Sequence, residues 1–150
     1  GRIDIKFISP IELDVDKHAF KILDMVREKN VERFIIDSIS SFESSVSDLQ
    51  KYKDYLWAIG QQLKSRHITT IFTALNEELF SPIVLTKAQI SLMTDNIIIL
   101  RYVEDGSNIK KVLGILKARG SNHDKALREY EIAPDGINIL GKLDRADMLR

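Results

Sequence analysis

DNIIILRYVE, residues 95–104, is the stretch that decides how this chain folds. Within it, residues 97–103 form a continuous apolar run of strand length, typical of a strand that is covered on both faces. Residues 110–119 and 127–133 have the pattern of two further strands, joined by the polar turn at residues 120–124. The end of the chain is therefore expected to form an antiparallel hairpin.

Strands and helices alternate upstream of this stretch. The helix predictions rest on apolar residues at helical spacing, and the strand predictions rest on short apolar or alternating runs. In chain order, we expect a strand at residues 3–8, a helix at 15–29, a strand at 31–37, a helix at 46–65 and a strand at 69–75. This order predicts an α/β fold with a mostly parallel sheet, an antiparallel edge and one domain over residues 1–150.

The composition excludes several classes of function. The sequence has no cysteine, which rules out disulfides and cysteine-based metal sites, and its three histidines lack the spacing of metal ligands. Lys and Arg balance Asp and Glu at 22 each, so the formal net charge of zero argues against nucleic-acid binding and gives no attraction to an anionic membrane. Because no apolar run approaches the length of a membrane span, we expect a cytoplasmic protein.

Asp37 ends the apolar run Phe34-Ile35-Ile36. Nucleotide-binding α/β proteins often place a carboxylate at the carboxyl end of a parallel strand, where it holds the water shell of Mg²⁺. An aspartate in this position also serves as a helix cap or a turn former. Spacing alone favours the second role and leaves the first one open.

Lys117 and Arg119 lie two residues apart on a predicted strand, so their side chains share one face. Two neighbouring cations followed by Gly120 are suited to clamping a phosphate, because glycine allows the backbone to approach a ligand closely. The same pattern also fits a solvated edge strand with scattered charges. The residues alone favour that second interpretation.

The ordered blocks resemble KaiC-type ATPases. The likeness is carried by residues 95–104, by Lys117-Ala118-Arg119-Gly120-Ser121-Asn122-His123-Asp124-Lys125 and by residues 128–132, with further matches at residues 8–14 and 35–38. The resemblance implies a RecA-like P-loop NTPase sheet, mostly parallel with helices on both faces and with a C-terminal antiparallel hairpin.

The resemblance also implies roles for individual residues. Asp37 would be the Walker B acid, acting on Mg²⁺ through water, and Lys117 and Arg119 would contact the γ-phosphate of ATP bound to a neighbouring subunit of a hexameric ring. Arg119 would stabilise the charge of the departing phosphoryl group. The remaining residues expected near the nucleotide are Ala118, Ser121, Asn122 and His123.

The stretch of residues 86–95 resembles the autophosphorylation segment of the second ATPase domain of clock proteins. Thr86 and Ser91 match hydroxyl positions there, and they are therefore candidate phosphorylation sites of a Ser/Thr autokinase. Leu92 stands where clock proteins carry a threonine, so one of the two adjacent sites is absent. Ordinary loop polarity explains Thr86 and Ser91 equally well.

The sequence contains no Gly-x-x-x-x-Gly-Lys-[Ser/Thr] phosphate-binding loop. We therefore expect a partial domain whose P-loop strand and helix are missing from the N-terminal side, and we expect these 150 residues alone to be inactive. The alternative is a non-catalytic KaiC-like module for interaction and oligomerisation. Either form is compatible with regulatory protein partners.

Overall fold

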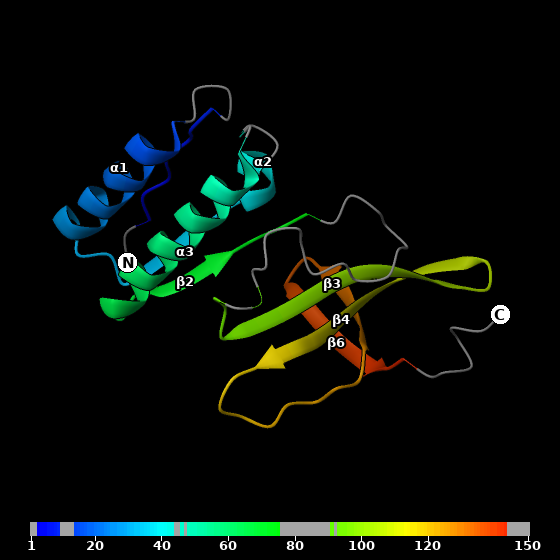
Figure 1. Cartoon of the computed structure of the whole chain (residues 1–150). Coiled ribbons are helices and arrows are strands. Elements are labelled where there is room, and N and C mark those ends of the chain that lie inside the picture. The colour runs from blue at the N-terminus through cyan, green and yellow to red at the C-terminus, as the bar shows by residue number, and fades with distance from the viewer. Residues whose placement is uncertain are drawn as a thin grey trace. The chain divides into compact units, whose positions relative to one another are not determined.

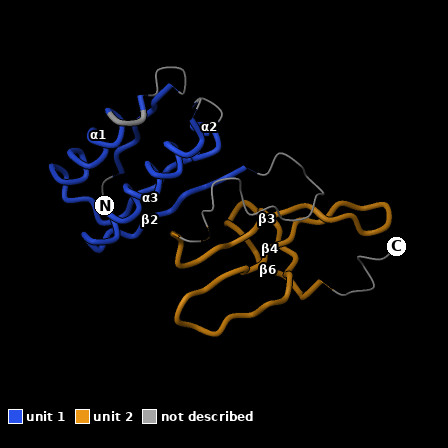
Figure 2. The backbone as a smooth tube through the Cα atoms, in the orientation of Figure 1, with its two compact units in different colours: residues 1–75, 86–89 blue, residues 76–85, 90–150 orange. Residues whose placement is uncertain are grey.

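A computed structural model describes residues 3–9, 14–43, 46, 48–75, 91 and 93–143, apart from the side chains of residues 15 and 16. The chain divides into two compact units (Figure 2). Unit 1 comprises residues 1–75 and 86–89, and unit 2 comprises residues 76–85 and 90–150. Each unit is described by itself.

Unit 1 combines three helices with a short parallel sheet (Figure 1). Its elements are α1 (Val15–Glu28), β1 (Arg33–Ile36), α2 (Ile39–Glu43), α3 (Leu49–Ser65) and β2 (Thr69–Phe72). Strands β1 and β2 pair in parallel, with Ile35 opposite Ile71. The two longer helices and both strands lie where the sequence predicts them, whereas α2 was not predicted.

Helix α3 supplies most of the core of unit 1. Asp48 caps its N-terminus, because the carboxylate accepts hydrogen bonds from the backbone N–H groups of Gln50 at 2.9 Å and Lys51 at 3.1 Å. The apolar stripe that predicts the helix is the face that it buries. Its fully buried residues are Tyr52, Leu56, Ile59 and Leu63.

Residues 3–8 form no strand, so that prediction was wrong. The segment pairs with none of the strands that the structure describes. Ile3, Ile5 and Phe7 are at least 85% exposed, and Asp4 forms an ion pair with Lys29, the residue that follows α1. Alternation of apolar and polar residues marks a chain suited to a sheet, but a strand forms only where a partner edge accepts its hydrogen bonds.

Unit 2 contains a four-stranded antiparallel sheet in the order β3-β4-β5-β6 (Figure 1). The strands are β3 (Asn96–Asp105), β4 (Asn108–Ala118), β5 (Arg128–Ala133) and β6 (Gly136–Lys142). Gly106, with φ of +58°, lies in the turn between β3 and β4, and Gly136, with φ of +138°, begins β6. The first three strands were predicted, whereas β6 was not.

The pairing of β3 corrects one part of the prediction. Residues 97–103 were expected to run in a mostly parallel sheet, covered on both faces, but β3 pairs antiparallel with β4. Ile98 and Leu100 on one face are 63% and 60% exposed. Hydrophobicity identifies a strand but carries no information on the direction of its partner. The fold is mixed α/β, with one parallel and one antiparallel sheet among the described residues.

Candidate functional site

Asp37 lies at the carboxyl end of β1, directly beside the residue that follows β2. Since the two strands are parallel, their carboxyl ends meet at one edge. The Thr73 hydroxyl donates a 2.6 Å hydrogen bond to Oδ1 of Asp37, and the Thr73 N–H donates to the Ile36 carbonyl at 3.1 Å. The carboxylate is thus oriented by a neighbour while it stays exposed to solvent.

The surroundings of Asp37 argue against a helix cap. The N–H of Ile39, the first residue of α2, donates to the Thr73 carbonyl at 2.9 Å and not to the Asp37 side chain. Ser38 pairs with Ser41 through their hydroxyls at 3.1 Å. In the described part of the chain, no second hydrogen bond or ion pair reaches the Asp37 carboxylate, which leaves Oδ2 facing water.

Asp37 fits a Mg²⁺ ion held through water better than a cage made of protein. No group of three or more His, Asp or Glu residues gathers around a common point within the described residues. Mg²⁺ commonly keeps several waters and takes one or two carboxylates together with substrate phosphates. A single oriented carboxylate with one open oxygen has the chemistry for that role.

Lys117 and Arg119 lie at the end of β4, and each has a separate partner. Arg119 donates its backbone N–H to the Asp95 carbonyl at 2.9 Å, and its guanidinium lies 3.6 Å from the Asp95 carboxylate. The Lys117 ammonium donates to the carbonyls of Ser91 at 2.5 Å and Thr94 at 2.7 Å. Each cation therefore has acceptors of its own, which offsets the repulsion expected from their spacing.

The loop after β4 carries the other residues expected near the nucleotide. Gly120 has φ of +74°, in the left-handed region that glycine adopts readily. Ser121 and Asn122 are exposed, whereas Ala118 and His123 are partly buried. The structure thus brings the whole Lys117–His123 stretch to one end of the antiparallel sheet, in unit 2, whereas Asp37 belongs to unit 1.

Asp124 organises this loop, a role that was not predicted from the sequence. Its carboxylate accepts from the Ala126 N–H at 3.0 Å and from two guanidinium nitrogens of Arg128 at 3.1 and 2.6 Å. The Ala126 N–H, and then Arg128, lower the pKa of the Asp124 carboxyl below its ordinary value. The spacing of an acid four residues before an arginine is the signal that was available.

Only one of the two candidate phosphorylation sites lies in the part of the chain that the structure describes. Ser91 is described and partly buried, at the start of the short segment that leads into β3. Thr86 and Leu92 lie outside the described residues. The Ser91 carbonyl is one of the two acceptors of the Lys117 ammonium, a link between two candidate residues that the sequence did not reveal.

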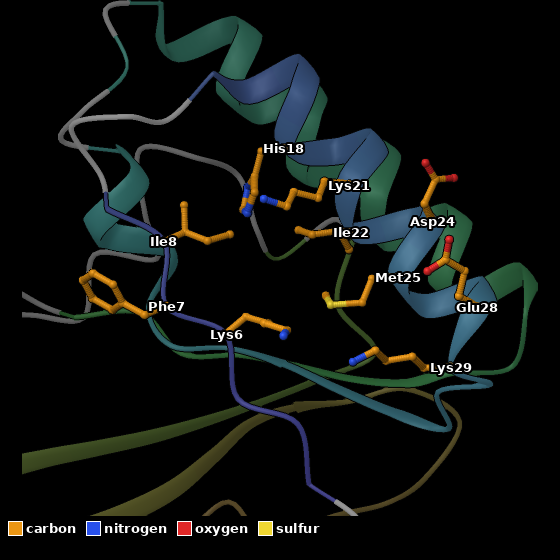
Figure 3. A pocket seen from close by; sticks show the side chains of 10 residues that line it. All are labelled: Lys6, Phe7, Ile8, His18, Lys21, Ile22, Asp24, Met25, Glu28 and Lys29. Carbon is orange, nitrogen blue, oxygen red and sulfur yellow. The ribbon is translucent and has the colours of Figure 1, made fainter.

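A groove of about 550 Å³ lies in unit 1, between α1 and the segment that precedes it (Figure 3). Its lining residues are Lys6, Phe7, Ile8, His18, Lys21, Ile22, Asp24, Met25, Glu28 and Lys29. Nδ1 of the buried His18 lies 2.8 Å from the Tyr55 hydroxyl, and Nε2 has no hydrogen-bond partner among the described residues. Burial, followed by the charge of Lys21, lowers the pKa of His18, so the ring is neutral near pH 7.

None of the described helices has the length and apolar character needed to cross a membrane.

Comparison with known proteins gives consistent matches. The family described as "ATPase: KaiC" matches residues 6–144. The circadian clock protein KaiC3 of Synechocystis is 32% identical over 139 residues, which are 93% of this chain and 27% of that protein. The circadian clock oscillator protein KaiC of Nostoc is 34% identical over the same shares of both chains. The chain thus spans about a quarter of the length of these relatives.

A solved structure shows the same fold. A KaiC-like protein of the hyperthermophilic archaeon Pyrococcus horikoshii OT3 superposes with a TM-score of 0.71 at 25% identity. The match covers 85% of this chain and 55% of that protein. The α/β prediction is thereby confirmed.

Proposed function

This chain belongs to the KaiC ATPase family, and from that premise we propose that residues 1–150 are one partial RecA-like domain of a protein that binds and hydrolyses ATP. The observation that carries the proposal is the Asp37 carboxylate at the carboxyl end of two parallel strands, held by Thr73 with one oxygen open. Ligands of open α/β sheets bind at that edge.

In this proposal Asp37 is the Walker B acid and acts on Mg²⁺ through water. The ion neutralises phosphate charge when Mg-ATP is bound. Thr73 holds Oδ1, so the carboxylate enters the reaction already oriented and loses little rotational freedom. These 150 residues include no phosphate-binding loop, so the phosphate cradle comes from other residues of the complete site.

The end of β4 serves a different nucleotide, that of a neighbouring subunit in a hexameric ring. Arg119 is half exposed and acts as the finger that stabilises charge on the γ-phosphoryl group. Lys117 supplies a second cation, and the exposed Ser121 and Asn122, with Ala118 and His123, line the approach to the nucleotide. The left-handed backbone of Gly120 supports this role, because it turns the chain sharply after the two cations.

We further propose Ser/Thr autokinase activity at Ser91 or Thr86, in a cytoplasmic clock-type or signalling regulator with regulatory protein partners. The relatives named as circadian clock proteins support the type of regulator. Leu92 has no hydroxyl, so phosphorylation never falls on that position.

One observation favours a second function, that of a non-catalytic module for oligomerisation. Cross-strand partners of an antiparallel sheet share a face. Ile98, Leu100 and Ile132 lie on one face of the sheet in unit 2, with Ile137 opposite Ile132, and all four are exposed. An apolar face of this kind fits contact with protein.

The experiment that separates the two functions is an ATPase assay on the full-length protein with Asp37→Asn. This change keeps the shape of the side chain and the acceptor for Thr73 but removes the charge near Mg²⁺. We expect turnover to fall by about two orders of magnitude or more, as for loss of an electrostatic group in other active sites. Asp54→Asn, on the exposed face of α3, is the matched control and leaves turnover unchanged. Equal turnover in both variants would remove the proposed role of Asp37.

A further inference from the structure

Lys117 is the feature of unit 2 that the proposed function does not fully use. We infer that Lys117 is a positioning residue that holds the Ser91 segment against β4, and that a phosphate bound at Lys117 loosens this segment. The Ser91 segment consists of the described residues 91 and 93–95. The inference rests on the proposed function only for the identity of the anion.

The first step is the geometry of the ammonium. Nζ of Lys117 donates to the carbonyls of Ser91 and Thr94, three residues apart, at 2.5 and 2.7 Å. Both carbonyls precede Asn96, the first residue of β3. A lysine side chain from β4 that donates to both of them works as a cap on this stretch, formed by a distant part of the chain.

The second step separates this cap from the sheet. The ladder between β3 and β4 continues to Asn96 opposite Ala118, and the N–H of Arg119 extends it to the Asp95 carbonyl at 2.9 Å. Backbone pairing thus holds the C-terminal end of the Ser91 segment, whereas the side chain of Lys117 holds the part before it. Removal of the Lys117 ammonium therefore affects residues 91–94 without breaking the ladder.

The third step is charge. Lys110 on the same strand pairs with Asp105 at 2.7 Å and Glu129 at 3.5 Å, and Arg119 pairs with Asp95. No carboxylate pairs with Lys117 among the described residues, and its two acceptors are neutral carbonyls. This ammonium therefore has no opposite charge beside it in the described part of the chain, and an ionised phosphate attracts it more strongly than a neutral carbonyl does.

The consequence is a competition. An ammonium has three N–H groups, of which two are directed at the carbonyls of Ser91 and Thr94. A phosphate that engages the ammonium with more than one of its oxygens needs more than the one remaining N–H, so it takes an N–H from at least one carbonyl. The occupancy of the nucleotide at Lys117 thereby controls how firmly the candidate phosphorylation site Ser91 is held.

Hydrogen exchange of the full-length protein, read by mass spectrometry on peptides that cover residues 91–97, tests the first half of the inference. Without nucleotide, Lys117→Met should raise exchange in residues 91–95 by roughly tenfold, the size expected for loss of a charged hydrogen bond. Lys117→Arg keeps donors at this position and should restore most of the protection. Lys111→Met, a matched change on the same strand, should leave this peptide unchanged.

Addition of a non-hydrolysable Mg-ATP analogue tests the second half. In the wild-type protein the analogue should raise exchange of the same peptide, and in Lys117→Met it should add nothing further. Unchanged exchange in Lys117→Met without nucleotide, with peptides of β5 and β6 still protected, would overturn the positioning role. If the analogue does not bind, the proposed function and the coupling are both wrong. The comparison without nucleotide still decides whether Lys117 holds the Ser91 segment.

Discussion

The two units of the chain bury their apolar residues very differently. Of the buried apolar side chains in the described residues, only Val103 and Val112 belong to unit 2. The others are Ile22, Val26, Ile36, Ile39, Tyr52, Tyr55, Leu56, Ile59 and Leu63, all in unit 1. Unit 1 has its own core, formed where α1 and α3 pack together, whereas unit 2 is held mainly by the hydrogen-bond ladders of its sheet.

This difference separates apolar residues that stabilise the fold from apolar residues that form an exposed surface. The faces of α1 and α3 turn inward, so their apolar residues raise the free energy of unfolding. The exposed face that holds Ile98, Leu100 and Ile132 adds little to the stability of unit 2 by itself. Equal substitutions in the two units should therefore have unequal effects.

Leucine-to-alanine substitutions should show the largest contrast. Leu56, in α3, is 0% exposed, so Leu56→Ala should lower the free energy of unfolding of unit 1 by about 3 kcal/mol through the cavity it leaves. Leu100→Ala, at a residue 60% exposed on β3, should cost less than about 0.5 kcal/mol. Urea unfolding measures both, with Trp57 fluorescence reporting on α3 and far-ultraviolet circular dichroism on the whole chain. Equal losses would show that the leucine on β3 is covered in solution.

A glycine-to-alanine pair probes the packing inside unit 2. A Cβ at Gly114 would lie 2.6 Å from Leu127 Cδ2 and 3.3 Å from Ile99 Cδ1. Gly114→Ala should therefore destabilise unit 2 by about 1 kcal/mol, since the Leu127 side chain must shift. Gly141→Ala on β6, where a Cβ meets no atom within 4 Å, is the control and should not destabilise the sheet. Indistinguishable urea midpoints for the two variants would mean that this close approach does not exist.

The pH dependence of unit 1 should show the smallest effect. The pKa of His18 in the folded chain is lowered below 6.5 by burial and Lys21, while the unfolded chain binds a proton at the ordinary value. The stability linked to His18 is therefore fully present above pH 6.5 and is lost as the pH falls toward the folded pKa.

Urea unfolding across this range should show a shallower loss for His18→Phe than for the wild type. Tyr55 and Phe42 contact the His18 ring, and Lys6 and Lys21 line the same groove, so all four are kept unchanged. His67→Asn is the control, because asparagine also accepts the left-handed backbone, φ of +59°, found at that position. Parallel pH profiles of the wild type and His18→Phe would contradict the buried neutral ring.

Much of the local structure was predictable from the sequence, because hydrophobic period and length mark α1, α3 and strands β1 to β5. The position of Asp37 at the end of β1 was predictable for the same reason. Its partner Thr73 was not, since the sequence does not state which strands are neighbours. The partners of Lys117 were hidden likewise, because backbone carbonyls carry no sequence signal. The expected pairing direction of β3 and the expected strand at residues 3–8 were wrong, because the partner of a strand is decided only in the assembled sheet.

Mixing of two inactive variants tests the central claim most directly, namely that Asp37 and Arg119 of one subunit serve two different nucleotides. Full-length Asp37→Asn and Arg119→Ala should each have little ATPase activity. After subunit exchange at equal amounts, verified by native mass spectrometry, a ring with shared sites has both intact residues at about one boundary in four, so ATPase activity should return to roughly a quarter of the wild-type value. Activity no greater than that of the two variants measured separately would contradict a site shared between neighbouring subunits.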